Sequence, residues 1–591
     1  MATEAFRLQP KASISLGVQA ARSPRTRARL AAPRASGLTA MADDQGRPTT
    51  AALVETRDVN AVTDHLGDAV VEVEQLSPSI LSVQADASVL VGLSALREVR
   101  RVQSKKLAQP HLDLALPDIG LRADELGARP VPEDGTDVLI GIVDSGFDLS
   151  HPMFRDAGGR LRVEAVLDQT RTPAAEFTTE QLEQAWAGGT GPGNDEDGHG
   201  THVAAIAAGS RFGALEGVAP GARLLLVKTD FRNTDQAVAW VFAKAGNRPC
   251  VINLSLGHHF GAHDGTDVEE RLHGQLTGPG KIIVISAGNE RTDDLHIGAS
   301  FVPQQTDEVL FDLQRQPDGQ AFTVLTLWHA REDRFTISLR TPLGDVITEP
   351  ALGNGSTSTF GAASMTVSQQ RYQPSNLIQH QIEVEFGAQA SNNDLRGWSV
   401  GIRCRTASIG RLDGWFLNSG YATFRRPHPL IEAARTVGLP ATGAGGLTVA
   451  SHVSRTTWHA DAGNMSDPDS LLGRSSVFSS LGPTRDGRAK PDLSAPGQRL
   501  QAALSHESRR AGDTRIASIG DRLLALAGTS MSAPMVTGAV ALLLQQKPDR
   551  DIADIQSVLA RSVRRDAHTG PALWNPIYGM GKLDVVAALR A

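Results

Sequence analysis

Three side chains spread along the sequence could together activate a hydroxyl nucleophile. Ser530 lies among small residues in the segment Gly528–Pro534, ahead of an apolar run that predicts a helix. Asp144 ends an apolar run that predicts a buried strand, and His199 opens an alanine-rich stretch that predicts a second helix. A serine hydroxyl is a poor nucleophile and needs an adjacent base that titrates at about pH 7. These residue types therefore predict nucleophilic catalysis by Ser530, with the histidine as base and the acid behind it.

Each of the three is predicted at the end of an element. Asp144 ends its strand, and the carboxyl ends of parallel strands are where open α/β sheets place functional groups. The helices that are predicted to begin near His199 and Ser530 offer unpaired N–H groups, which stabilise negative charge. The pattern is typical of an α/β fold in which strand ends and helix starts form one site.

The chain resembles the subtilisin-like serine proteases, the subtilase superfamily of S8 type. Eight segments carry the resemblance, in the order of that family: Asp144–Gly146, His199–Ala204, Gly217–Ala222, Val251–Gly257, Ser286–Glu290, Phe478–Pro483, Lys490–Gly497 and Gly528–Pro534. They fall within about residues 136–291 and 431–590. The resemblance implies a subtilisin-like parallel sheet with helices on both faces.

The resemblance also implies a role for each residue of the triad. Ser530 would attack a peptide carbonyl, and His199 would take its proton and return it to the leaving amine. Asp144 would hold the histidine in the correct tautomer and stabilise the imidazolium. Asn289 aligns with the asparagine of the oxyanion hole, where it would donate together with the Ser530 backbone N–H.

Substrate-binding positions follow from the same resemblance. They are Ser255, Leu256 and Gly257, which would pair with the substrate backbone as an added strand, Ala287 and Gly288 in a pocket wall, and Gly438 at the pocket floor. A glycine at the floor would admit a large apolar side chain at P1, the substrate residue before the cleaved bond.

Other histidines and acids suggest metal binding only weakly. His199 and His202 are three residues apart, but no third ligand follows at a convincing spacing, so we expect a base and a buried helix histidine. The polar segment His258–Asp264 is expected to be a solvated loop at the substrate cleft rather than a metal site. Asp197 is expected to cap the helix that begins at His199.

Subtilisins hold a structural calcium ion, and this sequence departs from the ligand set that the resemblance implies. Met153 stands where an aspartate is expected, and a thioether cannot replace the oxygen ligands that calcium requires. The loop 209–216 also lacks the asparagine-rich ligands. We therefore expect no cofactor and no metal at this position, while other calcium sites stay open.

Composition limits the classes of protein and partner. The chain has 591 residues, which exceeds one hydrophobic core, and it is 40% hydrophobic with 58 glycines. Its net charge of -7 gives no reason to expect nucleic acid or an anionic membrane as partner. Cys250 and Cys404 are no disulfide framework, and no apolar run of the sequence approaches membrane-spanning length.

Five regions are expected. They are a disordered basic tail (1–50), a propeptide-like domain (51–105), the first part of the catalytic domain (106–294), an inserted β-sandwich (295–422) and the second catalytic part (423–591). In the insertion, apolar residues alternate with period two, which predicts strands. Its position and the pattern around Leu327-Trp328 resemble the jelly-roll insertion of the clostridial Csp germination proteases. We expect a rigidifying clamp, with a substrate-binding module as the alternative.

Residues 51–105 predict a β-α-β-β-α-β order, which is ferredoxin-like. Strands are predicted at 53–55, 70–73, 80–84 and 99–102, and helices at 59–66 and 87–96. This order resembles the subtilase propeptides, which chaperone folding and block the cleft with their C-terminal tail. By that resemblance the tail Val102–Pro110 would lie in the active site and could be cut there.

Together these observations predict a serine endopeptidase that hydrolyses peptide bonds through an acyl-enzyme and is made as a self-inhibited zymogen. Its expected partners are protein or peptide substrates and its own propeptide, without nucleic acid or membrane. The alternatives are a propeptide-locked pseudoprotease that acts as a binding scaffold, and a transpeptidase on the same fold. The basic N-terminal stretch has no apolar signal core, so we expect a cytoplasmic location, with secretion by another route as the alternative. Oligomeric state and natural substrate stay open.

Overall fold

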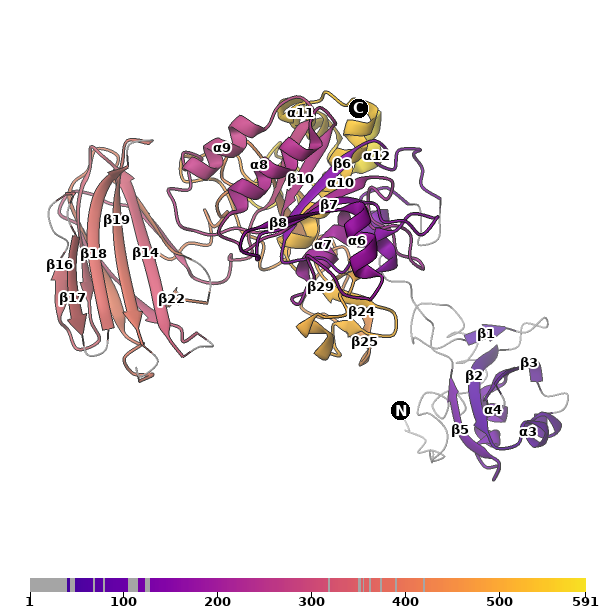
Figure 1. Ribbon diagram of the computed structural model, residues 1–591. Coiled ribbons are helices and arrows are strands. Elements are labelled where there is room, and N and C mark those ends of the chain that lie inside the picture. Colours follow the sequence, from indigo (N-terminus) through magenta and orange to yellow (C-terminus); the bar gives the residue numbers. More distant parts are fainter. Residues whose placement is uncertain are drawn as a thin grey trace. The chain divides into compact units, whose positions relative to one another are not determined.

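The structure is a computed structural model (Figure 1). It describes residues 40–42, 48–66, 70–77, 80–104, 115–122, 128–316, 319–348, 352–353, 355–360, 363–372, 375–387, 391–417 and 420–591. The chain divides into two units, residues 1–109 and 110–591. The expected tail 1–50 lies mostly outside the described residues, and the prediction of disorder is wrong for 40–42 and 48–50, which pair as strands.

The described part of the first unit is an antiparallel sheet with two helices. Its elements are β1 (Ala40–Ala42), β2 (Pro48–Thr56), α3 (Val59–Leu66), β3 (Val70–Ser77), β4 (Ile80–Ala85), α4 (Ala87–Leu93) and β5 (Val99–Ser104). The strands follow the order β5-β2-β4-β3, and β1 also pairs with β2. Val54, Val62 and Leu90 are among the apolar side chains of its own small core. Helix α4 ends before the predicted residue 96, since Gly92 in its last turn weakens the helix.

An eight-stranded sheet forms the centre of the second unit. Its order is β26-β23-β11-β10-β6-β9-β7-β8, and all neighbours are parallel except β7 and β8. The strands are β6 (Leu139–Asp144), β7 (Val163–Asp168), β8 (Ala175–Thr178), β9 (Arg223–Lys228), β10 (Cys250–Leu254), β11 (Lys281–Ser286), β23 (Leu447–His452) and β26 (Leu493–Pro496). The central strands are buried on both faces, which explains their continuous apolar runs.

Helices cover both faces of this sheet. They are α5 (Ala115–Asp118), α6 (Thr179–Trp186), α7 (His199–Ala208), α8 (Thr234–Ala245), α9 (Val268–Leu276), α10 (Thr529–Gln546), α11 (Ile552–Ser562) and α12 (Val585–Arg590). Ile140 and Ile142 of β6 face the core that holds α7 and α10, while Leu139 and Val143 face the core that holds α8. The predicted α/β fold with helices on both faces is confirmed. Among the described helices, none combines the length and the apolar character needed to cross a membrane.

Residues 296–424 form two antiparallel sheets around one apolar core (Figure 1). Their orders are β12-β21-β14-β19-β18-β17 and β16-β15-β20-β13-β22. The strands are β12 (His296–Ser300), β13 (Thr306–Leu313), β14 (Ala321–Ala330), β15 (Arg334–Arg340), β16 (Val346–Thr348), β17 (Gly355–Phe360), β18 (Ala363–Tyr372), β19 (Leu377–Phe386), β20 (Trp398–Thr406), β21 (Arg411–Phe416) and β22 (Ala422–Phe424). The jelly-roll assignment and the exact domain boundaries stay predictions.

The second unit also contains two small antiparallel sheets, β24-β25 and β27-β29-β28. They are formed by β24 (Thr457–Ala460), β25 (Gly463–Ser466), β27 (Leu500–Ala503), β28 (Ala517–Ser518) and β29 (Leu523–Leu526). Short 3-10 turns lie at Pro152–Phe154 and Arg509–Gly512.

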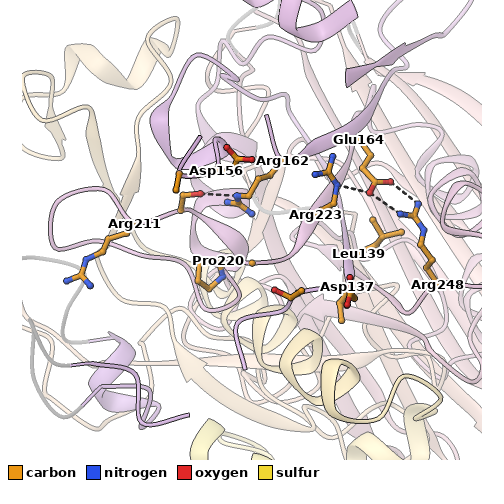
Figure 2. A pocket seen from close by; sticks show the side chains of 14 residues that line it. Asp137, Leu139, Asp156, Arg162, Glu164, Arg211, Pro220, Arg223 and Arg248 are labelled. Carbon is orange, nitrogen blue, oxygen red and sulfur yellow. Dashed lines mark hydrogen bonds and ion pairs between the residues drawn. The ribbon is translucent and has the colours of Figure 1, made fainter. Parts of the chain in front are cut away.

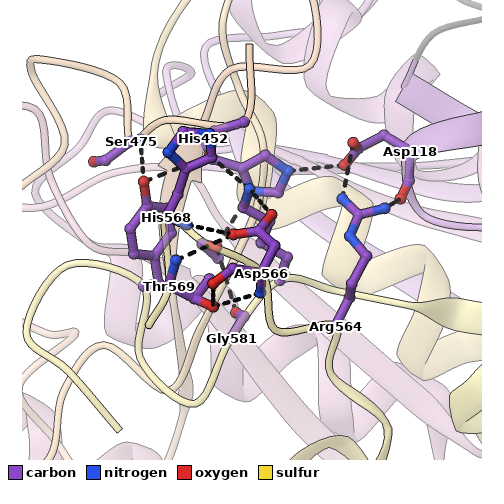
Figure 3. Close-up of polar contacts among 12 residues, drawn as sticks. Asp118, His452, Ser475, Arg564, Asp566, His568, Thr569 and Gly581 are labelled. Carbon is purple, nitrogen blue, oxygen red and sulfur yellow. Dashed lines mark hydrogen bonds and ion pairs between the residues drawn. The ribbon is translucent and has the colours of Figure 1, made fainter. Parts of the chain in front are cut away.

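The start of the second unit is attached to the α/β body by partly buried polar contacts (Figure 3). Nε2 of His452, at the end of β23, lies 2.8 Å from Asp118 Oδ2, and the Arg564 guanidinium donates to Asp118 Oδ1 at 2.9 Å. The apolar side chains of Ala115 and Leu116 lie in the main core. The chain from Ala115 onward is therefore a structural part of the α/β body.

Candidate active site

Asp144 and His199 meet at the carboxyl edge of the parallel sheet. Asp144 is the last residue of β6 and His199 the first of α7, and Asp144 Oδ1 lies 2.7 Å from His199 Nδ1. The same oxygen accepts a hydrogen bond from the Ser145 N–H at 2.7 Å. A carboxylate next to Nδ1 holds the proton on that nitrogen, which leaves Nε2 as the basic nitrogen of the neutral ring.

The surroundings make His199 a stronger base than a free imidazole. Burial by itself lowers its pKa, but the charge of Asp144 and the hydrogen bond to it outweigh burial and raise the pKa above its ordinary value. The histidine side chain is 23% exposed and the aspartate 2%, so the histidine is the member of the pair that is open to solvent.

The helix start that carries His199 is held by Asp195. Its carboxylate accepts hydrogen bonds from the Gly198 N–H and the Thr201 N–H, each at 2.9 Å. Asp197, the predicted cap, instead pairs with Arg510 at 2.9 Å, so that prediction was wrong. The physical reason is the turn at Gly198, whose φ of 88° folds the chain so that the earlier aspartate reaches the first helical turn.

Ser530 lies in the first turn of α10, where its backbone carbonyl and its hydroxyl both contact Ser255. Pro534 has no N–H, so it cannot donate to the Ser530 carbonyl four residues earlier. The Ser255 hydroxyl donates to that carbonyl instead, at 2.8 Å. The Ser530 hydroxyl in turn donates to the Ser255 carbonyl oxygen at 3.3 Å. Because a hydroxyl carries one proton, this hydroxyl must rotate before it can donate to His199.

A buried relay of side chains holds Ser255 in place. The Thr537 hydroxyl of α10 donates to Asn253 Oδ1 at 3.0 Å, and Asn253 Nδ2 donates to the Ser255 hydroxyl at 2.9 Å. Neither Asn253 nor Thr537 was predicted as a site residue. The relay joins the end of β10 to the helix that carries the nucleophile.

The amide of Asn289 has a defined orientation. Its Oδ1 accepts from the Thr529 N–H at 2.8 Å and from the Thr529 hydroxyl at 3.1 Å. An N–H requires an acceptor, so this contact assigns Oδ1 to the side of α10 and leaves the Nδ2 hydrogens for another acceptor. The backbone N–H of Ser530, in the first helical turn, lacks an intrahelical acceptor. The Asn289 amide and the Ser530 N–H are thus available donors of two residues that line the same cavity.

All six predicted substrate-binding residues line one cavity together with Ser530 and Asn289. This cavity measures 190 Å³, and the six are Ser255, Leu256, Gly257, Ala287, Gly288 and Gly438. The strand order β11-β10-β6 explains the grouping, because their carboxyl ends lie side by side. Among the described residues, the backbone groups of Leu256 and Gly257 have no hydrogen-bond partner, so a substrate strand could pair with them.

The histidine-rich segment 258–264 differs from its prediction. His259, His263 and Asp264 are buried rather than solvated, because Trp415 of the inserted sheets stacks on His263 with ring centroids 3.9 Å apart. His259 and Glu290 also line the cavity, although neither was predicted as a site residue.

The remaining predicted histidine, His202, is structural. It is fully buried in α7, and its Nε2 lies 2.8 Å from the Leu524 carbonyl oxygen. Burial lowers its pKa to about 3, so the ring is neutral.

Among the described residues, one group has the types and spacing of metal ligands: His296, Asp413 and Glu432. The Arg411 guanidinium already contacts both carboxylates of this group. Because a protein cation fills the position between the acids, the donor set does not call for a metal ion.

The residues around Met153 do not fit a calcium ion. Arg162 is buried there and donates through its Nη atoms to the carbonyl oxygens of Met153, Ala208 and Ala222, and through Nε to the Ser210 hydroxyl. Burial lowers the pKa of Arg162 to about 10, which leaves the group positive at neutral pH. The Arg162 guanidinium thus donates to carbonyl oxygens on both sides of the loop 209–216.

Arg162 also lines a larger cavity, of 670 Å³, at the amino edge of the sheet (Figure 2). Glu164 lies there between Arg223 and Arg248 and accepts from both, at 2.8 Å in each ion pair. The strand starts that line this cavity are remote in the sheet from the strand ends that carry Asp144 and Ser255. The larger cavity is therefore separate from the candidate active site.

Comparison with known proteins places the chain with a family of proteases. The model of the subtilase family (peptidase S8) matches residues 135–581. The minor extracellular protease Vpr of Bacillus subtilis is 22% identical over 507 residues, which cover 83% of this chain and 55% of Vpr. A calcium-dependent protease of Trichormus variabilis is 37% identical over 147 residues, 24% of this chain and 19% of that protein. The chain thus spans less than two thirds of the length of these relatives.

Among solved structures, the CspB protease of Clostridium perfringens has a similar fold. Its TM-score is 0.64 at 22% sequence identity, and the match covers 77% of this chain and 93% of CspB. The family match spans most of the chain and includes Asp144, His199 and Ser530. The chain therefore belongs to the subtilase family.

Proposed function

We propose that the protein is a serine endopeptidase. The observation that carries the proposal is the shared cavity: Ser530 and Asn289 line it, and the Asp144–His199 pair stands at the same edge of the sheet. The proposed nucleophile, base, orienting acid and oxyanion donor thus lie after the ends of strands in one sheet or in the first turns of the helices packed on it.

The proposed reaction begins when Ser530 Oγ attacks the carbonyl carbon of the scissile bond and its proton passes to His199 Nε2. Asn289 Nδ2 and the Ser530 N–H donate to the oxyanion. His199 then protonates the departing amine, the C–N bond breaks, and an ester on Ser530 remains. Water gives a proton to His199 and attacks this ester, and the serine recovers its proton as the acid product leaves. Asp144 stays ionised and stabilises the imidazolium throughout.

The proposed substrates are proteins or peptides in extended conformation. The unpaired backbone groups of Leu256 and Gly257 support this, since a β-strand of substrate needs such an edge. The 190 Å³ cavity next to Ser530 would then receive the P1 side chain.

We also propose that the first unit is a propeptide and that processing occurs between Ser104 and Ala115. The lower limit is the end of β5, and the upper limit is Ala115, the first described residue of the second unit, which is buried in its core. Cleavage within the segment Ala115–Leu121 would remove side chains from the main core. The cytoplasmic location stays a prediction.

The test compares intact mass and casein cleavage for the wild type, Ser530→Ala and Ser532→Ala. Ser532 lies on the same helix and is fully buried, so its alanine variant controls for damage to α10. The proposal predicts that wild type and Ser532→Ala are cut between residues 104 and 115 and digest casein, whereas Ser530→Ala stays whole and inert. Covalent labelling by a fluorophosphonate, which reacts with activated serines, should follow the same pattern.

Other outcomes identify the alternatives. A wild type that stays whole, inert and unlabelled favours the propeptide-locked scaffold. Labelling together with products of joined peptides, seen by mass in the presence of an added amine, favours a transpeptidase.

For the cofactor, we propose that Arg162 replaces the structural calcium. Chelation should then leave the melting temperature unchanged, whereas Arg162→Met should destabilise the protein by about 3–5 kcal/mol, because buried carbonyl oxygens lose their donors. Thermal unfolding with and without chelator measures both effects. A chelator-induced drop in the wild type as large as that caused by the substitution would contradict this role.

A further inference from the structure

The 670 Å³ cavity at the amino edge of the central sheet has a volume typical of small-molecule sites (Figure 2). Its cationic lining residues are Arg162, Arg211, Arg223 and Arg248, and its acidic lining residues are Asp137, Asp156 and Glu164. Positive charge thus exceeds negative charge by one, and Asp137 is exposed to solvent. The ligand class that this charge balance favours is an anion.

The other two acids already have cationic partners within the protein. Glu164 Oε1 accepts from Arg223 Nε at 2.8 Å, and Arg248 donates to both oxygens of the same carboxylate. Asp156 Oδ1 accepts from the Arg160 N–H at 3.0 Å, and its Oδ2 accepts from Arg160 Nε at 3.2 Å. These ion pairs hold the arginines in place without using all of their donors.

Arg162 is the buried cation of the cavity, and one of its donors is unused. The residue is 5% exposed. It donates through Nε to the Ser210 hydroxyl, through Nη1 to one carbonyl oxygen and through Nη2 to two others. A guanidinium has five N–H groups, so one N–H of Nη1 has no acceptor among the described residues. A donor of this kind on a buried cation favours an acceptor that a ligand supplies.

Two further guanidinium groups offer unused donors to the same cavity. In the described part of the chain, Arg223 donates through Nε alone, which leaves the hydrogens of both its Nη atoms. Arg211, in the loop after α7, has no hydrogen-bonded or ionic side-chain partner within the described ranges. The pKa of Arg162 is lowered to about 10, first by burial and then by the positive charge of Arg223. These two cations are therefore close enough to repel, and an anion between them would remove the repulsion.

The cavity also has an apolar side. Val138 and Leu139, at the start of β6, line it and are each 1% exposed. Ala157 and Pro220 add further apolar lining. A guanidinium binds phosphate and carboxylate oxygens through pairs of N–H groups. A ligand with an oxyanion at one end and an apolar group at the other would use both sides of the cavity.

We propose that this cavity binds a small organic oxyanion, a phosphate or a carboxylate carried on an apolar group. Arg162, Arg211 and Arg223 bind the oxyanion, and Val138 and Leu139 contact the apolar group. The cavity lies at the start of β6, whereas Asp144 ends this strand at the active-site edge. The proposal is therefore independent of the endopeptidase function.

The test titrates the full-length Ser530→Ala protein, so that proteolysis by Ser530 does not interfere. The ligands are phenyl phosphate, benzoate and the neutral benzyl alcohol, all at one ionic strength. Calorimetry measures the dissociation constant, and thermal unfolding measures the stabilisation of the folded state by the ligand. We expect at least one anion to saturate the protein with a Kd below about 10 mM and to raise its melting temperature. The alcohol should bind at least about tenfold more weakly. The anion that binds more tightly identifies the ligand as a phosphate or a carboxylate.

Arg223→Gln and Arg211→Gln should each weaken anion binding by about tenfold, because each removes charged donors. Arg232→Gln is the matched control, since Arg232 is an exposed arginine just beyond the carboxyl end of β9, the strand that begins at Arg223. It removes the same charge from the opposite edge of the sheet and should change the affinity by less than about twofold.

Failure of both anions to saturate the protein by about 10 mM overturns the site. An alcohol that binds as tightly as the anions overturns it as well, and so does a control variant that weakens binding as much as Arg223→Gln. The comparison of the anions with the alcohol needs no arginine variant, so misfolding of a variant does not remove the test.

Discussion

Two histidine–carboxylate pairs lie at the cleft, and they differ in the ring nitrogen that faces the acid. In the Asp144–His199 pair the acid faces Nδ1 at 2.7 Å, whereas in the Glu290–His259 pair it faces Nε2 at 3.5 Å. His199 keeps Nε2 free toward the cleft, while His259 uses Nδ1 to bind a second histidine. The first ring can accept and return a proton in catalysis. The second ring is held between Glu290 and His263, so the same residue types make different contacts according to their neighbours.

The largest expected effect separates the two acids. Asp144→Asn should lower kcat by about 10⁴-fold, because an amide that donates to His199 Nδ1 favours the wrong tautomer. Glu290→Gln should change kcat/KM by about tenfold at most, because Glu290 contacts His259 and Ser480 rather than His199. Steady-state kinetics with P1-matched peptides measures both. Equal losses in the two variants would remove the distinction between the pairs.

The next effect concerns the oxyanion donor beside the first pair. Asn289→Leu should lower kcat by about 10²–10³-fold with little change in KM, because the donor acts on charge that develops in the transition state. Thr529→Ala removes one of the two hydrogen bonds that orient the amide but keeps the Thr529 N–H, so its loss should be about tenfold or less. A KM effect of Asn289→Leu larger than its kcat effect would argue for a role in ground-state binding instead.

The pH profile tests the basic strength of the first histidine. His199 must be neutral to accept the serine proton, and its pKa is raised by Asp144. The acid limb of kcat/KM for a substrate with uncharged P1 should therefore lie above pH 6.5, with activity falling about tenfold per pH unit below it. His259→Gln should leave this limb in place. A limb below the ordinary histidine value would contradict the geometry of the pair.

The smallest effect is on stability, and it concerns the helix start that presents His199. Asp195→Asn should lower the free energy of unfolding by about 1–3 kcal/mol, since one carboxylate oxygen that accepts from Thr201 becomes a donor. Asp197→Asn is the control, and should change it by at most about 0.5 kcal/mol because its ion pair with Arg510 is exposed. Urea unfolding measures both. A larger loss at Asp197 would restore the cap predicted from the sequence.

The sequence was a good guide where a local pattern carries the information. The apolar run before Asp144 and the alanine-rich stretch after His199 predicted the ends of β6 and the start of α7, since periodicity and small residues act within one element. The segment Gly528–Pro534 and the apolar run after it likewise predicted the start of α10, which carries Ser530. The sequence failed at Asp197, because the path of the chain through Gly198 decides which aspartate reaches the helix.

It failed again for His259, His263 and Asp264, which were expected in a solvated loop and are buried in the structure. A polar loop is expected in solvent unless another part of the chain covers it and satisfies its donors. That cover is Trp415, which is distant in sequence and belongs to the inserted sheets. Local composition carries no signal for such a contact.

By itself, the sequence determined the elements, the family pattern and the residue types at the cleft, because these depend on neighbours along the chain. Only the tertiary structure decided which nitrogen of each histidine faces an acid, that Arg162 binds the carbonyl oxygens near Met153, and that Glu290 lines the cavity next to Ser530. These depend on side chains from strands and loops far apart in sequence, whose distances and protonation are defined only once the sheet and the insertion have packed.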